Sequence, residues 1–376
     1  MELEFVGSTS GGQLLRIVAP IVGIIHATTG QQFKITITDF RKGLGLGKQH
    51  LAGFSAVCDA CGICAIDNDT KGPVSVGTKN IYFETQSMPQ ITTEITCDVK
   101  SAGSCTLVIQ TLLPTLLFLS QSSTKLKIIG GTDVDMSPPI YEMISGLFHT
   151  VLPSFGIPKI DVLQVKRCWN HAQFSKFGGL GEVVLNVPHM ELSQLNPINS
   201  TWNGISKMIF NVHCPSLKYH DTLNELINKL KTYPFGNIPF ELTTSKDNYN
   251  GNEPIIISVT FVSIEGCHCT THRVTDNIDK IIDEIRKFGD NIVVPFDDHL
   301  QDQILLFMAL ANGPSCINVR LDGVNHANAY DHLYNAINVY NVFGNKMKGI
   351  KMFDVVHLHD SIYKVTCTGT LAERTV

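Results

Sequence analysis

The sequence has few charged residues and no excess of basic ones. Asp, Glu, Lys and Arg make up 17% of its 376 residues, and 29 Lys and Arg against 34 Asp and Glu give a net charge of −5 at pH 7. Proteins that coat a nucleic-acid duplex have a strongly basic balance. Extensive wrapping of nucleic acid is therefore excluded, whereas the binding of one phosphate group by a few local Arg or Lys side chains is not.

Long apolar runs are missing as well. No stretch reaches the roughly 20 apolar residues that cross a bilayer, and the sequence begins without the basic and apolar segments of a signal peptide. With 43% hydrophobic residues, the chain can form one large globular domain and a small one. We expect a soluble intracellular protein, in the nucleus (nucleoplasm or nucleolus) or the cytoplasm.

A repeated cysteine pair of the kind that holds zinc is also lacking. Cys58, Cys61 and Cys64 form a C-x-x-C-x-x-C run among 11 cysteines, but no later C-x-x-C completes a four-ligand site. Helical spacing of the neighbouring apolar residues predicts that these thiols are small buried hydrophobic groups. Without a secretory signal, a disulfide framework is not expected either.

The stretch from residue 297 to 340 holds the most chemistry. Apolar residues between 300 and 311 recur at helical spacing and predict a buried helix. His299, Asp302 and Gln303 stand at i, i+3 and i+4, which places them on one patch of the first turn of such a helix. A short strand (316–321) then leads to a second helix, with His326 at its start.

A histidine at the start of a helix has properties that suit phosphate chemistry. The helix dipole disfavours the imidazolium, so the ring of His326 stays neutral and nucleophilic. Free backbone N–H groups nearby can hold a phosphate. A purely structural histidine is the alternative, and the polar patch upstream argues against it.

Three further segments contain candidate binding residues. GGQLLR (11–16) follows a Gly- and Ser-rich loop and begins a helix, and Lys100–Leu119 is an apolar helix with one amide, Gln110. Between them, Arg41, Lys42, Lys48 and His50 form a small basic cluster among glycines. That cluster is either a phosphate site or an ordinary solvated loop. In the helix of residues 100–119, Pro114 is expected to introduce a kink or to end the helix.

Taken together, these motifs resemble the RNA 3'-terminal phosphate cyclase family. HLQDQ (299–303) is similar to the family's YLxDQ, with His in place of Tyr, and SAGSCTLVIQTLLP (101–114) is similar to its SAGSCTLxxQTxLP. The resemblance implies that His326 is the nucleophile that becomes adenylylated, with His332 as the alternative. It further implies an ATP site, which comprises Gln110, Pro138, His299, Asp302 and Gln303.

The resemblance also implies a site for the RNA 3'-phosphate. FRKGLGLGKQHL (40–51) is similar to the family's IRxGRxxPGLxxQHL with about three residues missing, and the candidates for this phosphate are Arg16, Arg41, Gln49 and His50.

The metal site of the family is altered in this sequence. The acidic residue that helps to hold the family's divalent metal falls at Thr9, and a hydroxyl is a poorer Mg²⁺ ligand than a carboxylate. Asp133 and Asp135 are the candidates to replace it, with an ordinary turn as the alternative.

The fold implied by the resemblance is of the α+β class. Repeated βαβαββ units form a large domain from residues 1–187 and 273–376, and a small α+β domain is inserted at 188–272. Three segments (around 11–23, 102–118 and 300–313) each have a polar start, a Gln and an apolar helix, as such repeats would.

The implied function is an ATP-dependent cyclisation of an RNA 3' end. A His–AMP adduct transfers its adenylyl group to an RNA 3'-phosphate, which the adjacent 2'-hydroxyl converts to a 2',3'-cyclic phosphate. The cofactors would be ATP and a divalent metal, Mg or Mn, and the partner an RNA 3' end. The alternative is a non-catalytic relative that acts in ribosome biogenesis and pre-rRNA processing, through contacts with RNA and with ribosome-assembly proteins.

Overall fold

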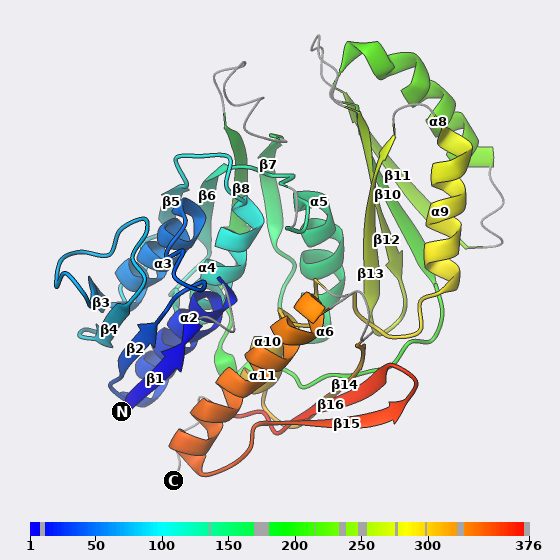
Figure 1. Cartoon of the computed structure of the whole chain (residues 1–376). Coiled ribbons are helices and arrows are strands. Elements are labelled where there is room, and N and C mark those ends of the chain that lie inside the picture. Colours follow the sequence, from blue (N-terminus) through cyan, green and yellow to red (C-terminus); the bar gives the residue numbers. More distant parts are fainter. Residues whose placement is uncertain are drawn as a thin grey trace.

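The computed structural model describes most of the chain. It covers residues 1–7, 12–134, 137–168, 180–214, 216–232, 238–246, 254–274, 277–297, 299–321 and 327–371, with the backbone alone for 327–331. Figure 1 shows a large body built of sheets and helices, beside which stands a smaller sheet with its own two helices.

The first structural unit forms the N-terminal part of the large body. It consists of β1 (Glu2–Val6), α2 (Gln13–Thr29), β2 (Lys34–Thr38), α3 (Lys48–Cys61), β3 (Ile63–Asp67) and β4 (Ile81–Thr85). Its sheet has the order β1-β2-β4-β3. Strand β1 runs parallel to β2, and the other two pairs are antiparallel.

The second unit repeats this plan. It consists of β5 (Glu94–Asp98), α4 (Cys105–Leu119), β6 (Thr124–Gly130), a continuous helix made of α5 (Ile140–Glu142), η1 (Met143–Val151) and α6 (Leu152–Ser154), β7 (Asp161–Lys166) and β8 (Gly181–Val187). Its sheet order, β5-β6-β8-β7, is that of the first unit with the same directions. The middle segment η1 is a π-helix.

The third unit repeats the plan again, with an insertion. Its elements are β9 (Asn199–Ser200), α10 (Ile304–Leu310), β14 (Ser315–Arg320), α11 (Ala327–Lys348), β15 (Phe353–His359) and β16 (Ile362–Cys367). They form a sheet in the order β9-β14-β16-β15, where the first pair is parallel and the others antiparallel. Three sheets of one topology confirm the expected α+β fold of repeated βαβαββ units.

The insertion between β9 and α10 folds as a smaller unit with its own core. Its strands are β10 (Lys207–Cys214), β11 (Phe240–Lys246), β12 (Ile255–Val262) and β13 (Cys267–Val274), and its main helices are α8 (His220–Thr232) and α9 (Ile278–Asp290). Buried residues of α8, α9 and this sheet form a second apolar cluster, separate from the core of the large body.

The boundaries of the inserted unit differ from the sequence expectation at both ends. Asn199–Ser200 pairs with β14 of the large body, although it lies inside the stretch assigned to the small domain. Helix α9, which was expected to return the chain to the large domain, buries Ile278, Ile282 and Ile285 in the second core. An amphipathic helix shows in sequence that one face is buried, but not which sheet covers that face.

Helices α2, α3 and α4 pack against one another and form the centre of the large core. Helix α4 continues through Pro114 to Leu119, so the proline does not end it. The missing N–H at Pro114 leaves the carbonyl group of Gln110 without its helical hydrogen bond, and dense packing on all sides of this apolar helix stabilises it regardless. Cys58 and Cys61 are buried in α3, as their spacing predicted, and burial raises the pKa of the Cys61 thiol to about 12.

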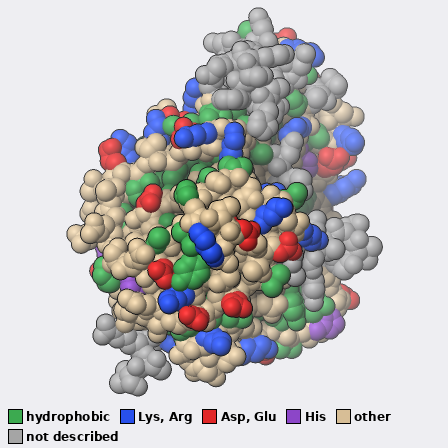
Figure 2. Space-filling view, turned by 60° about the vertical axis from the view of Figure 1, so that its left-hand side comes forward, with side chains coloured by type: hydrophobic (Ala, Val, Ile, Leu, Met, Phe, Trp, Pro, Cys, Tyr) green, Lys and Arg blue, Asp and Glu red, His purple; other side chains and the backbone are tan. Residues whose placement is uncertain are grey.

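In the described part of the chain, no helix combines the length and apolar character needed to cross a membrane. Figure 2 shows one face of the molecule, on which Lys and Arg side chains are interspersed with Asp and Glu.

Candidate functional site

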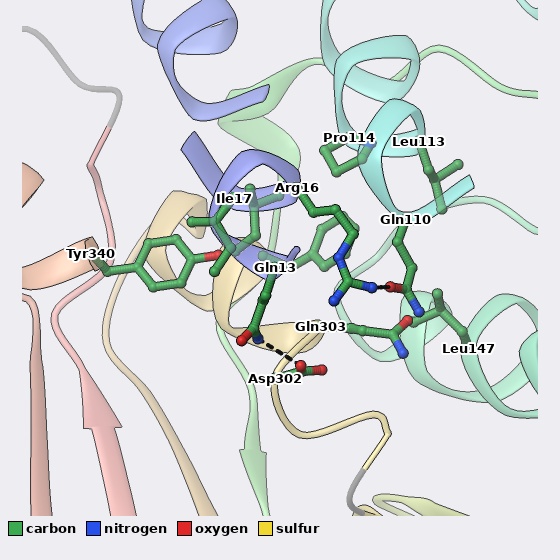
Figure 3. Close-up of a pocket in the computed structure, with 12 residues that line it drawn as sticks. Gln13, Arg16, Ile17, Gln110, Leu113, Pro114, Leu147, Asp302, Gln303 and Tyr340 are labelled. Carbon is green, nitrogen blue, oxygen red and sulfur yellow. Dashed lines mark hydrogen bonds between the residues drawn. The ribbon is translucent and has the colours of Figure 1, made fainter. Parts of the chain in front are cut away.

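A pocket lies where helices α2 and α4 meet the segment that precedes α10. Its polar lining comes from Gln13, Arg16, Gln110, Asp302, Gln303 and Tyr340, and its apolar lining from Ile17, Leu113, Pro114, Leu147, Leu306 and Phe307. Figure 3 shows the polar side chains converging from the three elements. Each of the three repeated units therefore contributes to one pocket.

Two hydrogen bonds join the units across this pocket. Nε2 of Gln13 donates to Oδ2 of Asp302 over 2.6 Å, which links the first unit to the third. Nη1 of Arg16 donates to Oε1 of Gln110 over 2.7 Å, which links the first unit to the second (Figure 3). The amide of Gln110, which the sequence placed alone on an apolar helix, has its partner in Arg16.

Burial shapes the charges of the pocket. It lowers the pKa of Arg16, against the attraction of Asp302, and a guanidinium nevertheless stays protonated at neutral pH. Burial also raises the pKa of Asp302, while Arg16 and, less strongly, His332 pull it down. The pocket thus holds the positive charge of Arg16 next to the carboxyl group of Asp302, and that positive charge favours the ionised form of the carboxyl group.

Two buried amide oxygens in this pocket have no hydrogen-bond partner among the residues that the structure describes. They are Oε1 of Gln13 and Oε1 of Gln303. A buried acceptor left unsatisfied costs roughly 1–3 kcal/mol, so both atoms favour a ligand that brings N–H or O–H donors. A nucleotide supplies such donors from its base and ribose, and its phosphates suit Arg16. The chemistry of these side chains therefore suits a nucleotide, of which the pocket itself, with about 40 Å³ of free space, holds only a part.

His299 does not share the pocket of Asp302 and Gln303. Helix α10 begins only at Ile304, and residues 299–303 form turns, because Oδ1 of Asp297 accepts from the N–H groups of His299 and Leu300. The sequence prediction of one helical patch for the three polar residues is therefore wrong. The turns direct Asp302 and Gln303 into the pocket and leave His299 exposed on another side.

Instead, His299 lines a neighbouring cavity of about 330 Å³ between the second unit and β13 of the inserted unit. Ser137 and Pro139, on either side of the buried Pro138, line this cavity too. The five predicted ATP-binding residues thus divide into three at the first pocket and two beside this cavity.

The predicted phosphate-binding residues gather beside the start of α2. Arg16, Gln49 and His50 line a small cavity together with Gly12. A Cβ atom at residue 12 would lie 2.1 Å from Nε2 of His50, so only glycine admits the histidine ring there. Arg41 lies close by, since its charge acts on His50.

In the structure, several of these side chains also hold backbone groups. Nη1 of Arg41 donates to the carbonyl oxygen of Gly45, Oε1 of Gln49 accepts from the N–H of Ser104, and Nδ1 of His50 accepts from the N–H of Gly47. These bonds fix the loops that precede α3 and α4. Among the described residues, Nε2 of His50, Nε2 of Gln49 and the remaining N–H groups of both arginines have no protein partner and can bind a ligand.

His50 makes the stability of the fold depend on pH. Burial, Arg41 and Arg16 lower its pKa from 6.5 to about 4, so the unfolded chain takes up this proton first and stability falls as pH drops from 6.5 towards 4. At pH 5 the loss should be about 2 kcal/mol. The variant His50→Asn keeps a hydrogen-bond acceptor but lacks this titration. Between pH 7 and pH 5, its free energy of unfolding in urea should fall by about 2 kcal/mol less than that of wild type.

A second buried histidine, His213, contributes the same pH dependence of stability to wild type and to His50→Asn, so it cancels in the comparison. Burial lowers its pKa to about 3, and it titrates alike in both proteins. An identical pH dependence of wild type and His50→Asn would contradict the assignment to His50.

The predicted nucleophile, His326, lies outside the described residues, as do Thr9 and Asp135. Helix α11 begins at Ala327, the residue after His326. His332 is exposed one turn further on, and its charge acts on Asp302. The start of α11 is therefore near the pocket.

Asp133 is already paired. Its carboxylate, 3% exposed, binds the 5% exposed guanidinium of Arg167 in two places and accepts from the hydroxyl of Thr132 over 2.6 Å. The ring of Tyr141 stacks on Arg167 at 4.9 Å. Asp133 is thus a structural ion-pair partner rather than a replacement metal ligand, and no group of three metal-ligating side chains occurs among the described residues.

Two pocket residues were not selected from the sequence. Gln13 is the first residue of α2, within GGQLLR, and its position in the matched motif was the signal that could have identified it. Tyr340 is buried in α11, where its place in an apolar helical pattern could not distinguish a pocket residue from a core residue.

Comparisons with known proteins show which family the chain is similar to. A family model described as RNA 3'-terminal phosphate cyclase matches residues 8–347. The chain is 28% identical to the RNA 3'-terminal phosphate cyclase of Caldivirga maquilingensis over 350 residues, which cover 89% of this chain and 90% of the relative. It is also 28% identical over 365 residues to that of Staphylothermus marinus, with 91% and 92% covered, and 35% identical over 158 residues to that of Pyrobaculum neutrophilum, with 42% and 41% covered.

Proposed function

Because the chain belongs to the RNA 3'-terminal phosphate cyclase family, we propose that it uses ATP to convert an RNA 3'-phosphate into a 2',3'-cyclic phosphate. The observation that carries this proposal is the pocket at which all three repeated units meet. Its Arg16, the Gln13–Asp302 hydrogen bond and two unsatisfied amide oxygens offer complementary groups to a nucleotide.

In this proposal ATP lies between the pocket and the neighbouring cavity. Gln110, Asp302 and Gln303 hold it on the pocket side, and Pro138 and His299 hold it on the other. Histidine in place of tyrosine keeps a flat ring for contact with a base. ATP supplies the activated adenylyl group, and the protein positions it.

The nucleophile of the proposed reaction is His326. A neutral ring nitrogen attacks the α-phosphorus of ATP, so that an N–P bond forms and pyrophosphate leaves. The RNA 3'-phosphate, held by Arg16, Arg41, Gln49 and His50, then attacks the same phosphorus and releases the histidine. Finally the 2'-hydroxyl loses its proton, attacks the activated phosphate and displaces AMP. Arg16 adjoins both sites, so it can stabilise charge in the first two steps.

A divalent ion, Mg or Mn, would offset charge on the triphosphate. Thr9 stands where the family has its acidic residue, and Asp133 is engaged by Arg167. The described residues therefore offer no complete site for this ion.

The proposal is tested by incubating the protein with α-labelled ATP and Mg²⁺ or Mn²⁺. We expect label on the protein, and its release as AMP on addition of a 3'-phosphorylated RNA, with a 2',3'-cyclic end as product. RNA that ends in a 3'-hydroxyl is the control and should leave the label in place. Absence of labelled protein with every metal would refute the proposed reaction.

A second function is favoured by Thr9. Loss of the acidic side chain is expected of a non-catalytic relative that acts in ribosome biogenesis through RNA and protein contacts. In that case the protein would bind 3'-phosphorylated RNA, remain unlabelled by ATP, and co-purify with ribosome-assembly proteins.

A further inference from the structure

Four basic residues stand around the entrance of the cavity lined by Arg16, Gln49 and His50. They are Arg41, Lys42, Lys48 and Lys100, and we call them the entrance cluster. Arg41 and Lys42 lie in the loop before α3, Lys48 is the first residue of α3, and Lys100 lies in the loop before α4. They come from different repeated units, so only the fold brings them together.

Two contacts place Arg41, Lys48 and Lys100 next to one another, and Lys42 follows Arg41 in the chain. Nζ of Lys48 donates to the carbonyl oxygen of Lys100 over 3.3 Å. A Cβ atom at Gly47, the residue before Lys48, would lie 3.5 Å from Nη1 of Arg41 and 3.1 Å from Nδ1 of His50. The cluster therefore continues directly from the residues assigned to the RNA 3'-phosphate.

The charges of the entrance cluster are not neutralised by ion pairs among the described residues. Elsewhere on the large body, Lys34, Lys125 and Lys127 each pair with a glutamate. Near the cluster, Asp98 accepts a hydrogen bond from the backbone N–H of Lys100, not from its ammonium group. Lys42, Lys48 and Lys100 are exposed, so their charges face solvent on a protein whose net charge is negative.

The backbone beneath the cluster is in an uncommon conformation. Arg41, Lys42 and Lys100 have φ angles of 55°, 53° and 54°, a left-handed region that is unfavourable for a residue with a Cβ. Glycine would relieve this cost but would remove the charged side chain. Strain of this kind that persists at side chains beside a binding cavity points to a role for those side chains.

A cluster of unpaired cations at the entrance of a phosphate site suits a polyanion longer than one phosphate. A single 3'-phosphate already meets Arg16, Arg41 and His50 inside. Leu44, 71% exposed between these basic residues, offers an apolar contact to a base. Single-stranded RNA combines a phosphate backbone with exposed base faces, and binding of this kind needs no particular sequence.

We propose that the entrance cluster binds the phosphates of the nucleotides just upstream of the RNA 3' end, so that the protein holds a single-stranded segment and not the terminal phosphate alone. This proposal rests on the proposed function for its RNA substrate. It adds Lys42, Lys48 and Lys100 as contacts to the RNA backbone. It also predicts that affinity rises with RNA length and falls with salt.

The test compares the triple variant Lys42→Gln/Lys48→Gln/Lys100→Gln with wild type. Fluorescence anisotropy measures binding of a 3'-phosphorylated single-stranded 12-mer and of a 3-mer at several salt concentrations, without ATP. We expect the variant to bind the 12-mer roughly tenfold more weakly or worse, and the slope of log affinity against log salt to become shallower by roughly 2, about 0.7 for each lost phosphate contact. The affinity for the 3-mer should change much less.

The control variant is Lys159→Gln/Lys231→Gln/Lys346→Gln, which removes the same charge from exposed lysines elsewhere. An unchanged 12-mer affinity in the entrance variant, or an equal loss in the control, would overturn the proposal. Thermal unfolding of both variants shows whether they fold. Binding is measured without ATP, so this test is independent of the labelling test. If wild type takes no label from ATP but loses RNA affinity when these lysines are replaced, the cyclase reaction is refuted and the RNA-binding surface is supported.

Discussion

His326→Ala should take no label from α-labelled ATP, and its cyclisation of RNA should fall by roughly 10⁴-fold or more, as expected when a covalent nucleophile is removed. His332→Ala should keep the label. His326 directly precedes the first residue of α11 in the sequence, and helix starts favour phosphate groups, whereas His332 lies within the helix and is exposed.

The two variants serve as controls for each other. Both remove one imidazole, at positions six residues apart in the sequence, and thermal unfolding of both variants would reveal a general loss of folding. If His332→Ala loses the label while His326→Ala keeps it, the nucleophile is His332 and the matched motif is shifted along the helix. If both keep the label, neither histidine is the nucleophile.

Asp133→Ala should lower the free energy of unfolding by about 3–5 kcal/mol, because it leaves the buried guanidinium of Arg167 without its counter-charge. The pair is almost fully buried and joined by two hydrogen bonds. It connects the turn after β6 to the end of β7, and so stabilises the second unit beside the cavity of His299. Urea unfolding at pH 7 measures the loss.

The double variant Asp133→Ala/Arg167→Leu distinguishes an ion pair from a metal ligand. With both charges removed, no unpaired charge stays buried, and part of the stability should return. The exposed Asp161→Ala, in β7, should change stability by less than about 0.5 kcal/mol. If Asp133→Ala instead unfolds like wild type but loses metal-dependent labelling, Asp133 is a metal ligand after all.

Local patterns in the sequence identified much of the fold. The apolar helix expected within residues 100–119 is α4, Cys105–Leu119, and the strand expected from 316 to 321 is β14, Ser315–Arg320. Such segments are determined locally because their apolar spacing and their Gly, Pro or Asn boundaries lie within a few residues of one another. The pairing of Gln110 with a polar group could be expected as well, since a buried amide needs a partner.

The identity of the partners was decided by tertiary structure. Which sheet covers α9, which cavity His299 faces and which cation pairs with Asp133 all depend on residues distant along the chain. His299 lies in the turns before α10, where Asp297 accepts hydrogen bonds from the N–H groups of His299 and Leu300, and apolar spacing alone did not show that the helix begins only after Gln303.

By itself, then, the sequence determined the elements, the family motifs and the residue types that suit a nucleotide and a phosphate. Only the folded chain brought Gln13 to Asp302 and Arg16 to Gln110, and set three lysines and an arginine from two repeated units around one entrance. The physical reason is that hydrogen bonding and apolar spacing within a segment act over a few residues, whereas a site is formed by contacts between segments whose relative positions the packing of the whole core decides.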